Sequence, residues 1–109
     1  MIARIWKGWT RNEDADTYEK ILREKVLPGL EGINGYHGGY VMRNMGENEV
    51  EFVVVNFFAS IEDVKKFAGE DYDIPVFEPE ARKVLSKVEP IARHYTIRID
   101  SVKKPGKST

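Results

Sequence analysis

The densest run of β-branched and aromatic residues in the chain extends from Val50 to Phe58. Only Glu51 and Asn56 interrupt this run, and no proline removes a backbone donor, so it is typical of a central strand buried on both faces. A side-chain amide left without partners in such a strand costs about 1–3 kcal/mol. The pattern therefore predicts that Asn56 either ties down neighbouring backbone or faces a polar cavity.

Three further segments show the alternation of strands. Residues Ile2–Thr10 alternate loosely and carry a tryptophan on each face. Tyr36–Arg43 is predicted as the next strand, and the polar loop Asn44–Asn48 joins it to the central strand. These two strands are therefore expected to be antiparallel neighbours. The last strand is predicted over Ala92–Val102, where the alternation is cleanest.

Apolar residues recur at helical spacing in three other segments. The first helix is predicted to begin at Asn12 as N-cap and to end or kink at Pro28–Gly29. Ser60 is predicted to cap a second helix, and Gly69 to stop it. Pro79 suits the first turn of a third, short helix. The inward-facing residues expected in that helix are Ala81, Val84, Leu85 and Val88.

The predicted order of elements is β-α-β-β-α-α-β. This order indicates an α+β fold of the ferredoxin-like, split βαβ type, with an antiparallel four-stranded sheet and helices on one face. Every predicted strand carries apolar residues on both faces, so a second copy packing sheet to sheet would cover the other face. A homodimer is therefore expected. Residues 1–102 are predicted to form a single domain, and residues 103–109, which contain no acidic residue, a flexible basic tail.

Composition narrows the classes of function. Seventeen basic and eighteen acidic side chains give a net charge of −1, and three of the lysines lie in the tail. A mildly acidic body is a poor partner for a phosphate backbone, so no nucleic-acid binding is expected. The chain has no cysteine, which excludes disulfides, thiol catalysis and cysteine metal sites. Neither a signal peptide nor an apolar stretch near 18 residues is recognisable, so no membrane contact and a cytoplasmic location are expected.

Several segments together resemble a known family. They are Met1–Thr10, Val26–Leu30, Ile33–Gly38, Glu51–Val64, Phe67–Tyr72 and Arg93–Tyr95. The family that they resemble is the antibiotic biosynthesis monooxygenase superfamily, and the resemblance covers nearly the whole chain. It implies a dimeric α+β barrel, in which two ferredoxin-like sheets form the barrel and the helices lie outside. It also implies a flat aromatic ligand held between the sheet and the helices of one protomer.

The resemblance implies two kinds of chemistry, cofactor-free oxygenation of quinols or polyketide-like aromatics, and haem degradation. The haem-degrading pattern places a tryptophan on the helix after the third strand, a histidine shortly beyond it and an asparagine on the first strand. Here Phe67 lies where that tryptophan would be, residues Glu78–Lys83 contain no histidine, and residues Ile2–Thr10 contain no asparagine. Haem binding is therefore the last of the hypotheses, and no cofactor is predicted.

His94 and Asn56 are the candidate catalytic residues. As a general base near neutral pH, His94 could accept a proton from a phenolic substrate before the electron-rich ring meets dioxygen. Asn56 would hold a substrate or peroxide oxygen through its amide. The alternative for His94 is a structural histidine, hydrogen-bonded in the sheet or at the dimer interface.

Trp6, Phe67 and Tyr72 are the candidates for substrate binding. A strand residue and a facing helix residue would enclose a flat apolar pocket, and Tyr72 would donate its hydroxyl from a loop that acts as a lid. Ordinary core packing is the alternative for these aromatic residues. No metal-ligand spacing is present, and the glycines of residues 35–39 indicate a bulge rather than a nucleotide loop. A non-enzymatic dimeric module that binds a small ligand or a partner remains the alternative to a monooxygenase.

Overall fold

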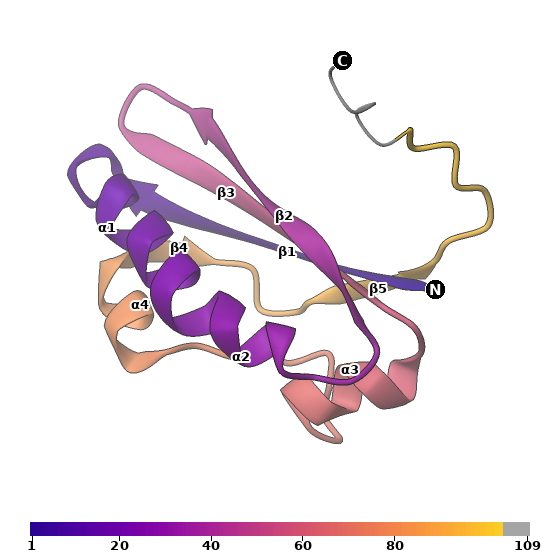
Figure 1. Cartoon of the computed structure of the whole chain (residues 1–109). Helices are drawn as coiled ribbons and strands as arrows, with labels where there is room; N and C mark the ends of the chain where they lie inside the picture. The colour runs from indigo at the N-terminus through magenta and orange to yellow at the C-terminus, as the bar shows by residue number, and fades with distance from the viewer. Residues whose placement is uncertain (104–109) are drawn as a thin grey trace, which may run out of the picture.

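The computed structural model describes residues 1–103, which form one antiparallel sheet with the helices packed on one of its faces (Figure 1). The strands are β1 (Ile2–Arg11), β2 (Tyr36–Met45), β3 (Glu49–Phe58), β4 (Leu85–Val88) and β5 (Arg93–Thr96). The helices are α1 (Ala15–Ile21), α2 (Leu27–Glu31), α3 (Ile61–Ala68) and α4 (Pro79–Val84). This arrangement is the predicted α+β, ferredoxin-like plan. Only Lys103 of the predicted tail belongs to the described residues.

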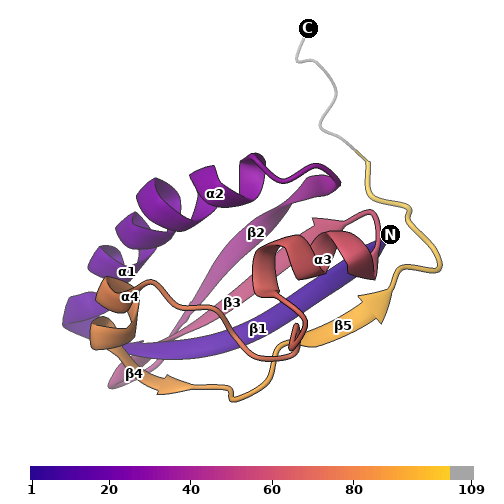
Figure 2. The ribbon, with the colours of Figure 1, turned by 90° about the horizontal axis from the view of Figure 1, so that it is seen from below.

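The sheet has the strand order β2-β3-β1-β4, and β5 also pairs with β1. β4 pairs with the end of β1 around Gly8 and Thr10, whereas β5 pairs with its beginning, from Ile2 to Ile5. Two short strands thus occupy the place of the single fourth strand that was predicted. Figure 2 shows them following one another along β1. The predicted antiparallel pairing of β2 with β3 is confirmed.

The predicted ends of two elements were wrong near the C-terminus. Leu85 and Val88 were expected on a helix, but they begin and end β4. The edge of β1 offers backbone groups that need partners, and pairing with them outweighs the helical spacing of these apolar residues. The last strand ends at Thr96 instead of Val102, and within residues 1–103 the pairing continues only through the Ile97 N–H, which donates to Met1 O at 2.9 Å. Ile99 is 89% exposed, so nothing in the described chain covers this alternating segment.

The first helical segment continues through Pro28 and Gly29, where an end or a kink was predicted. A π turn at Leu22–Val26 joins α1 to α2, and the wider turn accommodates the missing proline N–H. The prediction that Asn12 caps this segment was wrong. Its side-chain Nδ2 instead donates to Glu47 O at 3.2 Å.

The second helix begins and ends as the sequence predicted. The Ser60 side chain accepts a hydrogen bond from the Asp63 N–H at 3.3 Å, which caps the first turn of α3. Gly69 ends the helix with a positive φ of 82°, a conformation that favours glycine. No helix within residues 1–103 is long and apolar enough to cross a membrane.

The core lies between the sheet and the helices and has two apolar clusters. One surrounds Phe52 and Tyr18, and the other contains Phe58, Leu30 and Val64. β3 was predicted to be buried on both faces, but in the single chain only the side that faces the helices is deeply buried. On the other side the alternating residues are half-buried. Asn56 lies on β3 between Phe52 of the first cluster and Phe58 of the second.

Candidate functional site

A row of polar side chains crosses the sheet on the face that carries the helices. Arg4 of β1 is the register partner of Asn56 on β3 and of His94 on β5. Residues paired in this way point to the same side, with Cβ atoms about 4.5–5.5 Å apart. Arg4 is 5% exposed, Asn56 is 9% exposed, and the His94 side chain is 8% exposed. Burying a cation, an amide and an imidazole in an apolar layer costs folding free energy. Buried polar groups of this kind are typical of functional sites. We call Arg4, Asn56 and His94 the polar row.

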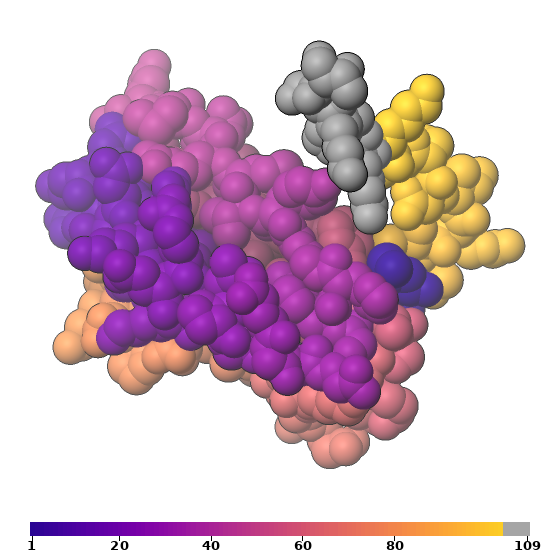
Figure 3. Space-filling view, viewed as in Figure 1, coloured from indigo at the N-terminus to yellow at the C-terminus, as the bar shows by residue number. Residues whose placement is uncertain are grey.

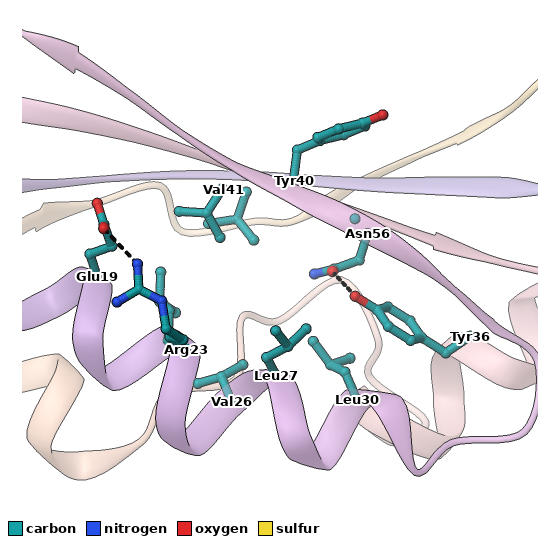
Figure 4. Close-up of a pocket in the computed structure, with 12 residues that line it drawn as sticks. Glu19, Arg23, Val26, Leu27, Leu30, Tyr36, Tyr40, Val41 and Asn56 are labelled. Carbon is teal, nitrogen blue, oxygen red and sulfur yellow. Dashed lines mark hydrogen bonds and ion pairs between the residues drawn. The ribbon is translucent and has the colours of Figure 1, made fainter. Parts of the chain in front are cut away.

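A cavity of about 320 Å³ opens beside the polar row, between the first helical segment and the β2–β3 hairpin (Figure 4). Figure 3 shows this segment, in violet, running along one side of the molecule below the hairpin. The apolar residues that line the cavity are Leu22, Val26, Leu27, Leu30, Val41 and Val54. Its volume lies at the lower end of the range for small-molecule sites. Among the described residues that line it, Asn56 is the one buried amide.

The Asn56 side chain is oriented by Tyr36. The Tyr36 hydroxyl donates to Asn56 Oδ1 at 3.0 Å. Burial raises the pKa of Tyr36, and Glu31 adds to this effect, so the phenol stays protonated and able to donate. The Nδ2 group of Asn56 points into the cavity and has no hydrogen-bond partner within residues 1–103 (Figure 4). Asn56 thus presents a free, oriented N–H donor to the cavity.

A bulge in β2 brings Tyr36 to this position. The pairing of β2 with β3 is irregular between Tyr36 and Gly39, and Gly38 has a positive φ of 97°. The bulge that the sequence predicted here is therefore confirmed. A Cβ at Gly39 would lie 2.2 Å from Val55 O and 2.5 Å from Asn56 Oδ1. The close approach of β2 to Asn56 therefore requires glycine at this position.

A smaller cavity of about 60 Å³ adjoins the first. Four residues line both cavities, namely Leu22, Val26, Val54 and Asn56. Arg4, Trp6 and Phe67 are among the other residues around the smaller cavity. Three of the five predicted site residues, Trp6, Asn56 and Phe67, thus come together here.

Trp6 is held rigidly by the interruption between β4 and β5. Its indole N–H donates to Glu89 O at 2.8 Å, which the interruption brings within reach. The ring also packs edge-on against Phe77, with centroids 5.4 Å apart. Trp6 therefore forms a fixed wall of the smaller cavity.

The other two predicted residues, Tyr72 and His94, contact each other on the far side of Arg4. Their rings pack edge-on with centroids 5.0 Å apart, and neither residue lines the two adjoining cavities. His94 Nε2 lies 2.9 Å from Arg4 Nη1, and a guanidinium can only donate, so Nε2 accepts and the His94 proton is on Nδ1. Nδ1 lies 3.3 Å from Asp73 Oδ1, but not in line for a hydrogen bond. Burial, and then the charge of Arg4, lower the pKa of His94, while Asp73 opposes them.

Arg4 is the residue of this site that the sequence did not single out. It donates through Nη1 to Tyr72 O and through Nη2 to Ile74 O at 3.4 Å, and its guanidinium lies over the Phe67 ring at 5.6 Å from the centroid. Burial lowers the pKa of Arg4 to about 10, with Asp73 opposing, so the side chain remains a cation at neutral pH. One signal was present in the sequence, because the alternation of the first strand places Arg4 on the same face as Trp6.

The titration of His94 gives a prediction about stability. Its pKa in the folded chain lies below the ordinary value of 6.5, so the unfolded chain binds the proton more readily. The contribution of His94 to stability is therefore fully present above about pH 6.5 and is lost as the pH falls through the folded-state pKa. Urea unfolding should show a free energy of unfolding that is lower at about pH 5 than at about pH 7.5.

A matched pair of variants isolates this effect. Glutamine at position 94 can still accept from Arg4 but does not titrate, so His94→Gln should have a weaker pH dependence than the wild type. His37→Gln, which changes an exposed histidine of β2, is the matched control. An unchanged dependence in His94→Gln would show that the acid sensitivity comes from other groups.

No family model matches the sequence. No curated protein matches it either. Several solved structures are similar to it in fold. A proposed antibiotic biosynthesis monooxygenase from Bacillus cereus is 12% identical with a TM-score of 0.63, and the match covers 96% of this chain and 98% of that one. A second proposed antibiotic biosynthesis monooxygenase, from Chloroflexus aurantiacus, is 16% identical with a TM-score of 0.58, covering 94% and 96%.

The chain shares the fold of these proteins. A NIPSNAP family protein from Agrobacterium tumefaciens has it too, with 19% identity, a TM-score of 0.56, and coverage of 93% of this chain and 88% of that one. The resemblance to antibiotic biosynthesis monooxygenases is thus confirmed for the fold. Sequence identities this low show a shared fold and no more. The chemistry therefore has to be inferred from the cavity and the polar row.

Proposed function

We propose that the chain is a cofactor-independent monooxygenase of the antibiotic-biosynthesis fold, which binds a flat aromatic substrate in the larger cavity. The observation that carries the proposal is the free Asn56 Nδ2 donor in a cavity of about 320 Å³ whose walls are mostly apolar, apart from the paired Glu19 and Arg23 side chains and Tyr36. The apolar walls suit a ring system, and the Asn56 donor suits one ring oxygen. This chemistry corresponds to a quinol or to a polyketide-like anthrone.

For an anthrone, the reaction that fits is the oxidation of its ring methylene to a carbonyl. Loss of a proton gives an electron-rich anion that can transfer electrons to dioxygen. One oxygen atom becomes the new carbonyl and the other leaves as water, and the substrate carbon supplies all four electrons. Asn56 would stabilise the negative charge on the substrate oxygen, because an oriented donor in a water-poor site acts at full strength.

The contacts of His94 favour a role different from the predicted general base. The lone pair of Nε2 already accepts from Arg4, and the ring lies outside both cavities. Proton transfer through His94 would need this contact to break. The proposal therefore assigns His94 to holding Arg4, and it keeps Asn56 as the group that touches the substrate. Tyr72 supports the same network through its ring and its carbonyl group.

Oxygen uptake with an anthrone tests the proposed activity, because this substrate carries the ring methylene that is oxidised. Asn56→Leu should lower the rate of uptake by about 100-fold, since removing one such donor typically costs a factor of that order or more. Asn44→Leu makes the same change at an exposed position of β2 and should retain the wild-type rate. Circular dichroism of both variants verifies the fold. Uptake by the wild type no faster than the reaction in buffer would contradict the proposal.

A non-enzymatic ligand-binding module is the second candidate, and one observation favours it. Glu19 carries the one carboxylate among the described residues that line the larger cavity. Arg23 and Arg43 donate to it at 2.9 Å and 3.0 Å, and the hydrogen bond from Arg43 is the main reason why its pKa is lowered. Glu19 is therefore a poor base. Binding of an aromatic ligand without oxygen uptake would select this candidate.

We also propose that two copies pack together through the face of the sheet that carries no helices. One half of this face is apolar. The residues of that half are Ile5, Tyr40, Met42, Val55, Phe57 and Tyr95. Tyr40 is 57% exposed and Tyr95 is 51% exposed, although their strands pair with the two central strands of the sheet, β3 and β1. The other half carries charges such as Glu51 and Lys87. A contiguous apolar area of this kind is typical of an interface, and a second copy would cover it.

A further inference from the structure

We infer that the ligand of this cavity is an acid, bound as the anion, and that the Arg4 guanidinium holds its negatively charged oxygen in the smaller cavity. The inference rests on the proposed function and makes its substrate class more specific. The class comprises phenols, enols and carboxylic acids attached to an aromatic ring system. Arg4 would be the residue that selects the charged form.

The first argument is that Arg4 is a buried cation with neutral partners. Its contacts are the His94 ring, the carbonyl groups of Tyr72 and Ile74, and the Phe67 ring. No carboxylate among residues 1–103 lies within 4 Å of it, and the nearby Asp73 side chain is 62% exposed. A charge removed from water is costly unless an opposite charge compensates it. A ligand anion would supply that compensation.

The second argument is the number of free donors. A guanidinium has five N–H groups, and Nη1 makes two hydrogen bonds while Nη2 makes one. Nε and one N–H of Nη2 therefore have no partner in the described part of the chain. Arg4 lines the smaller cavity, so it is in contact with the space that an acidic oxygen would occupy.

The third argument is the size and the position of the smaller cavity. Its volume of about 60 Å³ is close to that of two water molecules, so it admits an oxygen-bearing group and not a ring. Asn56 lines both cavities, so a ring system in the larger one would reach past Asn56 toward Arg4. Two neighbouring donors of the polar row would then contact the same end of the ligand.

This arrangement would also remove the need for a general base in the cavity. A cation beside a phenol stabilises the phenolate and lowers the pKa of the ligand, so the phenol O–H bond breaks and the proton goes to bulk water. The electron pair stays on the ligand oxygen, where Arg4 and Asn56 stabilise it. The absence of a free base among the described cavity residues is then consistent with substrate activation.

Binding of a matched pair of probes tests the inference. Isothermal titration with 2-naphthoate and with 2-naphthamide compares an anion with a neutral molecule of nearly the same shape. The wild type should bind the naphthoate at least about tenfold more tightly. Arg4→Gln should lose this preference, whereas Arg4→Lys, which retains the charge, should keep most of it.

A second measurement needs only the wild type, in case Arg4→Gln does not fold. The phenolate of 7-hydroxycoumarin absorbs at longer wavelength than the phenol, so a titration reports the pKa of the bound dye. That pKa should be at least about one unit lower than in buffer.

Equal binding of the two naphthyl probes with an unshifted dye would overturn the inference while leaving the cavity as a ligand site. Binding of neither probe would overturn both. A preference for the anion without oxygen uptake would support the inference and contradict the monooxygenase proposal.

Discussion

Phe52→Ala is expected to lower the free energy of unfolding by about 4 kcal/mol, the largest effect of any single substitution considered for this chain. Phe52 is completely buried in the middle of β3. Its ring meets Tyr18 of α1 edge-on, with centroids 4.8 Å apart, and the Arg43 guanidinium lies 5.5 Å from its centroid. Truncation would leave a cavity between the sheet and the first helix. Few domains of this size have stability to spare for such a loss.

Chemical denaturation of Phe52→Ala and Phe57→Ala distinguishes the contribution of the core to stability from that of the proposed dimer interface. Phe57 lies on the same strand but on the face without helices, where its ring packs edge-on against Tyr40. The loss in Phe52→Ala should be the same at every protein concentration. If two copies pack through the other face, the wild-type midpoint should rise with concentration, and Phe57→Ala should weaken that rise. A wild-type midpoint that does not depend on concentration would contradict the dimer.

The sequence predicted the fold well where local signals and long-range pairing agree. Ser60 and Gly69 bound α3 because a side-chain cap and a positive φ are local properties. The β2–β3 hairpin was predictable because a short polar loop joins two strands. Leu85 was misplaced because its spacing fits a helix, and only the neighbouring edge of β1 shows that it belongs to a strand. The passage of the helix through Pro28 depends on a π turn that no residue pattern announces.

The candidate site was predictable only in part, for a similar reason. Asn56 was conspicuous as a polar residue in an apolar run, and its amide does face a cavity. Arg4 was missed because an arginine near the start of a strand is usually at the surface. Its importance depends on the register that aligns Arg4, Asn56 and His94 across three strands. Register between segments about 50 and 90 residues apart is a tertiary property, which the periodicity of one strand cannot reveal.

Gly39→Ala is expected to be the most damaging small substitution near the cavity, with a loss of about 3 kcal/mol in the free energy of unfolding. The new Cβ would lie 2.2 Å from Val55 O and 2.5 Å from Asn56 Oδ1. A backbone oxygen within a sheet cannot rotate away as a side chain can, so β2 would have to separate locally from β3. The same shift would move Asn56 Oδ1 away from the Tyr36 hydroxyl, and the orientation of Nδ2 in the cavity would be lost.

The loss in Gly39→Ala should therefore appear in two measurements, a lower unfolding midpoint and a weaker affinity for an aromatic ligand such as 2-naphthoate. Gly29→Ala is the matched control, because Gly29 lies in α2 and a Cβ there would meet nothing within 4 Å. Alanine in a helix should raise the stability by about 0.5–1 kcal/mol and leave the affinity unchanged. If Gly39→Ala were as stable as the wild type and bound the ligand equally well, β2 would not need to approach Asn56 so closely. The bulge would then have no part in orienting the amide.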